Sequence, residues 1–361
     1  MDFTYERKVS HCSKSKYIKT VTVKEIEPVA NADALDIARF NEAGWQVVVK
    51  KGSVAVGDKL FFMPPETVLP RELSEALGVT KYLQKGKVKV VRMRGVFSEG
   101  LIADKQTCIP YLDGILQWED EPTQAMHGDA MPAREIPVDE FPVFYKIPNL
   151  LNEPEIFSPG DEVFVTEKIH GTNCRFGMLK NPATGRYQLY VGSHNVVLKN
   201  PDWKPSRWER FKAWLSGKKI PRPRPNVYWT TVTKILEGKT LPHGVVFYGE
   251  IYGAGVQDLD YGVPAKDLKL RVFATYERGQ YNTAIRTGSI CTLVGLDTVP
   301  RHGYTFLSVD NAIALSQEPS ELTKKHIREG VVIQSVLNPM KWAKVVSPEY
   351  LARRGKATER H

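Results

Sequence analysis

The chain has 361 residues, of which 42% are hydrophobic and 25% charged, the proportions of a soluble globular protein with room for two domains. No apolar run approaches membrane-spanning length, and the polar N-terminus lacks the apolar stretch of a secretory signal, so we expect a soluble cytoplasmic protein. Fifty Lys and Arg against 41 Asp and Glu give a net charge of +9, which favours a polyanionic partner without requiring one.

The four cysteines are Cys12, Cys108, Cys174 and Cys291. They lie far apart, with no C-x-x-C pair and no histidines at metal-ligand spacing. Because the sequence has no secretory signal, we expect reduced thiols and not disulfides.

Residues 17–62 read as short strands separated by turns, residues 73–77 as a short helix and residues 88–103 as a further strand pair. Short strands at this spacing predict a small barrel and not a doubly wound sheet. The strings VKEIEPVANADALDIARF and GWQVVVKKGSVAVGDKLFFMP resemble an OB-type module of the tRNA-binding kind. The resemblance implies a barrel that binds nucleic acid.

Basic and aromatic residues of this region form a candidate binding surface. They are Lys50, Lys51, Arg92, Arg94 and Trp45. Basic grooves with aromatic platforms bind single strands in OB folds. The alternative is that the basic residues are merely solvated and that Trp45 belongs to the core.

Residues 108–155 include an acidic, proline-rich stretch, LQWEDEPTQ followed by MPAREIPVDEFPVFYKIPNLLNEPE. Closely spaced prolines oppose regular structure and form a stiff, extended connection. We therefore expect one domain over residues 1–140, a linker to about residue 155, and a second domain over residues 156–361.

Residues 162–178, EVFVTEKIHGTNCRFGM, predict a strand up to Lys168, a turn at residues 171–173, and a second strand returning from it. A lysine at the mouth of a strand can act as a nucleophile if burial or neighbouring cations lower its pKa. The alternative is a solvated surface lysine, and the residues downstream decide between the two.

The string KIHGTN, residues 168–173, resembles motif I of the covalent nucleotidyltransferases, K-x-(D/H)-G-x-N. That superfamily contains the ATP-dependent polynucleotide ligases and the mRNA capping enzymes, and the KIHGTN form is most similar to the nick-sealing RNA ligases. The resemblance implies that Lys168 attacks the α-phosphate of ATP and forms a lysyl-AMP intermediate.

The residues around Lys168 acquire roles from the same resemblance. Glu167 is implied to reach the adenine edge, and Ile169 is counted among the nucleotide-binding residues. His170 and Asn173 are implied to position phosphate and metal.

Residues 186–198 predict a strand ending in Ser193-His194-Asn195. Similar ligases carry a polar or basic residue here, often arginine, so the role of His194 stays open. A satisfied turn histidine is the alternative.

Residues 199–225, KNPDWKPSRWERFKAWLSGKKIPRPRP, are the most basic segment. Ser206 can cap a helix in which Trp208, Phe211, Trp214 and Leu215 recur at helical spacing, which predicts that the aromatic residues pack inward. Basic residues on the other side, with Lys218, Lys219, Arg222 and Arg224, can follow a phosphate backbone or form a solvated face.

Residues 244–262, GVVFYGEIYGAGVQDLDYG, predict a strand that delivers Glu250 and then breaks into glycine-rich turns. This stretch resembles motif III, whose glutamate is implied to bind the ribose. Residues 268–276, LKLRVFATY, resemble motif IIIa, which implies that Phe273 stacks on adenine. Ala274 replaces the usual acidic residue after it. A core phenylalanine is the alternative for Phe273.

Residues 329–335, EGVVIQS, resemble motif IV, which implies that Glu329 holds the catalytic metal. Residues 338–355, NPMKWAKVVSPEYLARRG, resemble motif V, whose lysines contact the α-phosphate. Lys344 matches one of them. Trp342 occupies the place of the second lysine, and Lys341 lies one step further away.

Together these motifs resemble the phage-type nick-sealing RNA ligases, in particular the branch with an N-terminal OB module known from Deinococcus. The resemblance implies an α+β protein, with an OB-type barrel followed by a nucleotidyltransferase domain of antiparallel sheets and flanking helices. ATP and Mg²⁺ or Mn²⁺ are the implied cofactors, with Glu329 and Glu250 as metal ligands.

The implied substrate is nicked duplex RNA or an RNA/DNA hybrid, with RNA repair as the role and no obligate protein partner. A DNA ligase or capping enzyme is an alternative, although those place an OB domain after the catalytic domain. A catalytically inactive RNA-binding protein is another alternative. We also expect self-adenylylation to survive the removal of residues 1–140.

Overall fold

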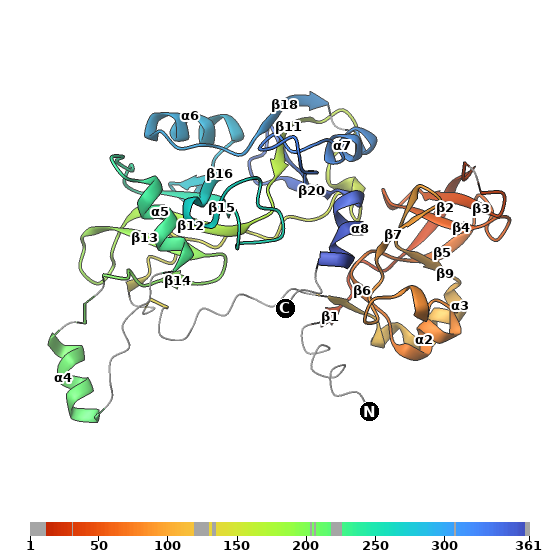
Figure 1. Cartoon of the computed structure of the whole chain (residues 1–361), viewed down its shortest axis with the longest axis horizontal. Coiled ribbons are helices and arrows are strands. Elements are labelled where there is room, and N and C mark those ends of the chain that lie inside the picture. The colour runs from red at the N-terminus through yellow and green to blue at the C-terminus, as the bar shows by residue number, and fades with distance from the viewer. Residues whose placement is uncertain are drawn as a thin grey trace.

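The computed structural model describes residues 12–30, 32–118, 130–131, 135–202, 204–205, 207–217, 226–306 and 308–357. Figure 1 shows an N-terminal barrel, from red to orange, beside a larger part built of two sheets. This α+β arrangement confirms the predicted fold class. Within the described ranges no helix is both long and apolar enough to cross a membrane.

The barrel is built on a five-stranded antiparallel sheet in the order β4-β3-β2-β5-β9. Its strands are β2 (Lys19–Pro28), β3 (Leu35–Phe40), β4 (Gln46–Lys50), β5 (Lys59–Met63) and β9 (Leu101–Ala103). The short helix α2 (Arg71–Ala76) lies close to its predicted position.

The hairpin of β7 (Val90–Met93) and β8 (Val96–Glu99) nearly closes the barrel. Backbone N–H groups of β4 donate to side chains of β8: Val48 to Oγ of Ser98 at 3.1 Å, and Gln46 to Oε2 of Glu99 at 3.2 Å. Side chains therefore replace a regular strand ladder at this seam.

A small sheet lies below the barrel, with β1 (Cys12–Lys14), β10 (Leu116–Trp118) and β6 (Thr67–Val68) in the order β1-β10-β6. Helix α3 (Lys105–Cys108) precedes β10 in the chain and runs into a 3₁₀ helix, Ile109–Gly114. The described cysteine side chains, those of Cys108, Cys174 and Cys291, are buried free thiols.

Trp45 joins the barrel to the second part of the chain. Its side chain is 2% exposed, and Nε1 donates to Oδ1 of Asn152 at 2.7 Å. The N–H of Gly44 donates to the carbonyl of Leu151 at 3.0 Å. Trp45 is therefore largely buried at this junction, and because it also borders the large cavity described below, its predicted role in a binding platform stays a prediction.

The hydrophobic core runs across this junction. One buried cluster contains Val21 and Phe40 of the barrel together with Leu151, Val163 and Val331 of the second part. Removal of residues 1–140 would expose Leu151, Val163 and Val331 to water. Survival of self-adenylylation after that deletion is thus no longer the expected result.

The second part contains a four-stranded sheet in the order β18-β11-β19-β20 and a six-stranded sheet in the order β14-β13-β12-β15-β16-β17. The first has β11 (Glu162–Lys168), β18 (Arg301–Phe306), β19 (Gly330–Ser335) and β20 (Trp342–Val346). The second has β12 (Thr172–Lys180), β13 (Tyr187–Ser193), β14 (Val197–Leu198), β15 (Val245–Tyr252), β16 (Lys269–Glu277) and β17 (Gln280–Tyr281).

Helices cover these sheets. Helices α5 (Val227–Ile235) and α6 (Ala284–Val294) contribute to the core of the six-stranded sheet, whereas α7 (Val309–Ser316) packs against the four-stranded sheet. Helix α8 (Pro348–Ala357) reaches back to contact β7 and β8 of the barrel (Figure 1).

The strands on either side of residues 169–171 do not form the predicted hairpin. β11 pairs with β18 and β19, whereas β12 pairs with β13 and β15 in the other sheet. Gly171 allows the crossing, because a Cβ there would collide with the backbone carbonyl of Ile251. The glycine is needed for a close backbone approach between strands.

Helix α4 (Arg207–Ser216) stands away from the body of the molecule (Figure 1). The prediction that its aromatic residues pack inward is wrong, since Trp208 is 58% exposed, Phe211 47% and Trp214 76%. Helical spacing identifies an apolar face without saying what covers it. Ser206, Lys218, Lys219, Arg222 and Arg224 lie outside the described residues.

Candidate active site

A cavity of about 850 Å³ opens between the two sheets and the barrel. The predicted site residues that line it are Glu167, Lys168, Ile169, Asn173, Glu250, Phe273, Glu329 and Lys344. The barrel side of the wall includes Tyr17, Glu66, Gln117 and Trp118, none of which sequence reasoning identified. Both parts of the chain therefore contribute to one cavity.

Lys168 and Glu329 form the central ion pair of the site. Lys168 ends β11 and is the partner of Gly330 in β19, so the residue before Gly330 lies beside it. Nζ of Lys168 is 2.8 Å from Oε2 of Glu329. Burial opposes ionisation of Glu329, but the Lys168 charge and the contact with His170 outweigh it and lower its pKa to about 2.

His170 lies behind this pair and does not line the cavity. It is 7% exposed, and its Nδ1 is 3.6 Å from Oε2 of Glu329 and 3.0 Å from the Tyr350 hydroxyl. Its backbone N–H donates to the hydroxyl of Tyr261 at 2.8 Å. The geometry makes His170 a residue that positions Glu329.

Glu250 and Asn173 occupy the opposite wall. They are direct partners in the β12–β15 ladder. Burial, with the negative charge of Glu329, outweighs the attraction of Lys168 and raises the pKa of Glu250 to about 8. Oδ1 of Asn173 is buried without a hydrogen-bond partner. A ligand that brings cations or hydroxyl donors would satisfy both groups.

Glu167 is anchored away from Lys168, as strand alternation requires. Its Oε1 accepts from the Ser320 hydroxyl at 2.5 Å, and its Oε2 accepts from the backbone N–H of Glu321 at 2.8 Å. Burial raises its pKa, although these hydrogen bonds oppose the shift. No sequence signal linked residues 320 and 321 to this glutamate.

Phe273 borders the cavity from β16. Its ring meets that of Phe144 edge-on, with centroids 5.2 Å apart and planes at 81°. Phe144 comes from the proline-rich stretch, which therefore supports the site. The predicted stacking of Phe273 on adenine stays a prediction.

The two candidate lysines of the last motif lie in different surroundings. Lys344 lines the cavity, whereas Lys341 does not. Nζ of Lys341 pairs with Oδ2 of Asp161 at 3.0 Å and lies 4.9 Å from the Phe157 ring centroid. β20 begins at Trp342, so alternation from Lys344 reaches Trp342 and not Lys341. The structure therefore places Lys341 outside the cavity, and its predicted contact with nucleotide stays a prediction.

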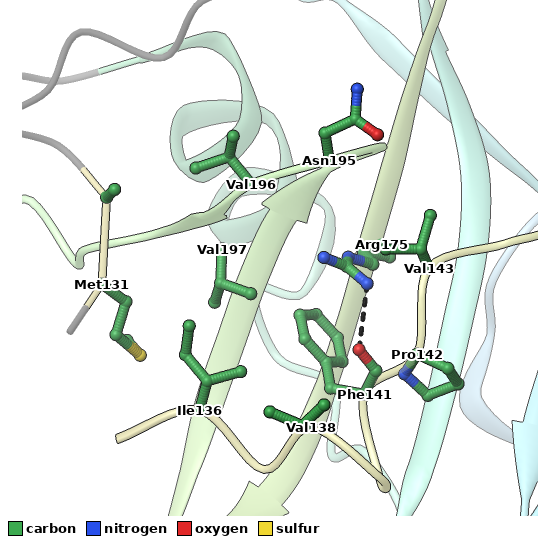
Figure 2. Close-up of a pocket in the computed structure, with 11 residues that line it drawn as sticks. Met131, Ile136, Val138, Phe141, Pro142, Val143, Arg175, Asn195, Val196 and Val197 are labelled. Atoms are coloured by element: carbon green, nitrogen blue, oxygen red, sulfur yellow. Dashed lines mark hydrogen bonds between the residues drawn. The ribbon is translucent and has the colours of Figure 1, made fainter. Parts of the chain in front are cut away.

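His194 lines the same cavity, and burial together with the nearby charge of Arg175 lowers its pKa. Arg175 itself is 3% exposed and was not identified from the sequence. Its Nη1 donates to the carbonyl of Phe141 at 2.9 Å, beside a second cavity of about 280 Å³ (Figure 2). Asn195 borders both cavities, so the two are neighbours.

The acidic residues fit a hard divalent cation that also binds a phosphate. No group of three or more His, Cys, Asp or Glu residues meets at metal-binding distance within the described ranges. Mg²⁺ and Mn²⁺ need no such group, since one or two carboxylates suffice when substrate phosphates and water complete the shell. Glu329 and Glu250, which both line the cavity, would supply such carboxylates.

A family model described as RNA ligase matches residues 161–346, just over half of the chain, and a model of an OB-fold domain matches residues 18–104. Structures of Naegleria gruberi RNA ligase variants with ATP and Mn and with AMP and Mn are similar in fold, with TM-scores of 0.65 and 0.66. Each is 19% identical and covers 94% of this chain and 99% of its own. No curated protein is similar enough to count as a match.

Proposed function

The chain belongs to the RNA ligase family, and from this premise we propose that it seals nicks between a 3′-hydroxyl and a 5′-phosphate at the expense of ATP. A lysyl-AMP intermediate on Lys168 carries the adenylate. The biological role is RNA repair. The observation that supports this proposal best is the shared cavity, in which Lys168 lies 2.8 Å from Glu329 and faces Lys344, Asn173 and Glu250.

The first step is attack of the Lys168 amine on the α-phosphate of ATP. A P–N bond forms, the bond from the α-phosphorus to the bridging oxygen breaks, and pyrophosphate leaves. Lys168 must first give up a proton to solvent, because the ammonium paired with Glu329 is not a nucleophile. Glu329 and Glu250 would hold a divalent cation, which would supply positive charge that offsets the phosphates.

The other cavity residues hold the nucleotide. Lys344 compensates charge on the α-phosphate, and Asn173 offers its unpartnered Oδ1. Phe273 covers the adenine. Ile169, 3% exposed at the cavity wall, contributes apolar contact. His170 lies behind Glu329, with Nδ1 3.6 Å from Oε2, and helps to position that carboxylate.

The later steps use the RNA ends. The adenylate passes from Lys168 to the 5′-phosphate, and the 3′-hydroxyl then displaces AMP to close the strand. Residues 1–140 bind the duplex and residues 156–361 carry out the transfers, with nicked RNA or an RNA/DNA hybrid as substrate. Residues of the N-terminal part such as Trp118 lie in the cavity wall, where they would contact a bound duplex.

Incubation with α-labelled ATP and Mg²⁺ or Mn²⁺ tests the first step. We expect covalent label on the wild type and on Lys341→Ala, and none on Lys168→Ala. Label on Lys168→Ala would contradict the assignment of the nucleophile. Sealing assays on nicked duplexes, with each strand exchanged between RNA and DNA, then test the substrate: failure on every RNA-containing nick would contradict it.

A further inference from the structure

Helix α4 carries an uncovered apolar face, which we call the α4 face: Trp208, Phe211, Trp214 and Leu215. Leu215 is 71% exposed, and the three aromatic residues are 47 to 76% exposed. An apolar patch of this kind marks an interaction site in a soluble protein. A helix of ten residues is also too short to be stable on its own, so this one gains from a partner.

The rings of the α4 face are arranged to accept flat partners. Trp208 and Phe211 are stacked, with centroids 5.6 Å apart and planes at 19°. Phe211 and Trp214 follow at 6.0 Å and 31°. The result is one stacked pair of rings followed by a third, tilted ring, all exposed to solvent, and stacking on exposed aromatic rings is how proteins hold unpaired bases.

The charge around this face is positive. Nζ of Lys212 lies 5.2 Å from the Trp208 ring centroid. Helical geometry places Arg210 and Lys212 on the two borders of the α4 face. Residues 199–225 contain nine Lys and Arg against two acidic residues, which is seven of the nine net positive charges of the chain. This charge complements a phosphate backbone.

We propose that the α4 face binds unpaired RNA nucleotides next to the break, with bases on the rings and phosphates beside Arg210 and Lys212. Paired bases in a duplex hide their faces, so the platform selects single-stranded RNA. The identity of the RNA as substrate rests on the proposed function. The helix lies outside the cavity, since none of its residues lines the cavity wall.

Anisotropy of a fluorescent single-stranded RNA of about 12 nucleotides, and of the same RNA in a duplex, measures this binding in the full chain. We expect the Trp208→Ala/Trp214→Ala variant to lose roughly tenfold or more in affinity for the single strand. Trp208→Phe/Trp214→Phe keeps aromatic rings and should retain most of it. Duplex affinity should change little in both variants.

Leu215→Ala is the matched control, because Leu215 is as exposed as the rings but cannot stack. Its affinity for single-stranded RNA should equal that of the wild type. An equal loss in Leu215→Ala, or full affinity in the double alanine variant, would overturn the proposal. So would binding of vesicles containing phosphatidylserine that depends on the same residues while RNA binding does not.

Self-adenylylation with labelled ATP separates this inference from the proposed function. Every α4 variant should label as the wild type does, which also shows that it is folded. If the wild type seals nicks and the alanine variant keeps full affinity for single strands, only the inference fails. If the wild type is neither labelled by ATP nor able to seal nicks, the proposed function fails. The anisotropy result then still decides whether the α4 face binds single-stranded RNA.

Discussion

The hydroxyl of Tyr350 lies 3.0 Å from Nδ1 of His170, and the two rings meet at 62°. This contact joins helix α8, which also touches β7 and β8 of the barrel, to the residue behind Glu329. The barrel and the ion pair of Lys168 are therefore connected through one helix. The contact suggests how docking of the barrel supports the geometry of the site.

Tyr350→Phe should slow self-adenylylation about fivefold at saturating ATP, because a typical hydrogen bond contributes about 1 kcal/mol and the ring stays in place. Single-turnover labelling with α-labelled ATP measures the rate. Thermal unfolding of the same variant is the control, because Tyr350 is 5% exposed and contributes to packing. An unchanged rate would show that His170 holds its orientation without Tyr350.

Lys344→Ala and Lys341→Ala form a matched pair of charge deletions on neighbouring positions. We expect Lys344→Ala to reduce the rate of labelling roughly 100-fold or more, the magnitude of a lost transition-state charge contact. Lys341→Ala should stay within about twofold, because its partner is Asp161 at 3.0 Å and exposed pairs contribute little. Equal losses of labelling rate in the two variants would indicate that Lys341 also contacts the nucleotide.

Glu99 makes the stability of the barrel depend on pH. Burial, only partly offset by the hydrogen bond from Gln46, raises the pKa of Glu99 to about 7. The folded state thus binds more protons than the unfolded state between about pH 4.5 and 7, so this group lowers stability as the pH rises through that window.

Above pH 7 the loss from Glu99 is complete and on the order of 3 kcal/mol. Glu99→Gln keeps an acceptor for Gln46 without the titration and should flatten this part of the profile. Urea unfolding at pH 5, 6, 7 and 8 compares the two proteins. If the free energy of unfolding of Glu99→Gln fell with pH as steeply as that of the wild type, another group would be responsible for the pH dependence.

Trp45→Phe should destabilise the chain without weakening RNA binding. Loss of the 2.7 Å bond leaves Oδ1 of Asn152 without this donor at the junction, at a cost of about 1–3 kcal/mol. A lower unfolding midpoint with unchanged anisotropy of nicked RNA is the expected pair of results. Weaker RNA binding at unchanged stability would show that Trp45 belongs to the RNA-binding surface.

Local sequence was sufficient to predict the strands of the barrel and to identify the main motif residues. Lys168, Glu250 and Glu329 lie more than a hundred residues apart at their extremes, and they nonetheless share a cavity as the motif order implied. The outcome for Lys344 and Lys341 also follows from alternation along β20. Each of these features depends on residue types and spacings that are visible within a short stretch of sequence.

Other features depended on partners distant in the chain. Trp45 is a residue type that is common in binding platforms. Its hydrogen bond to Asn152 and its packing in the core bury it at the junction instead. The aromatic residues of α4 have the periodicity of a packed helix, but no part of the chain that the structure describes covers them. Arg175 lies outside the motif strings, and the stretch that resembles motif V gave Tyr350 no role, so only the tertiary structure placed them beside the site.

The sequence by itself pointed to the chemistry proposed for this protein, because the candidate nucleophile, the carboxylates and the strands that present them are specified by short stretches of residues. The tertiary structure decided which side chains face the cavity, where the chain crosses from one sheet to the other, and that the barrel shares a core with the second part. Burial and strand pairing arise from residues far apart along the chain, so no local pattern contains them.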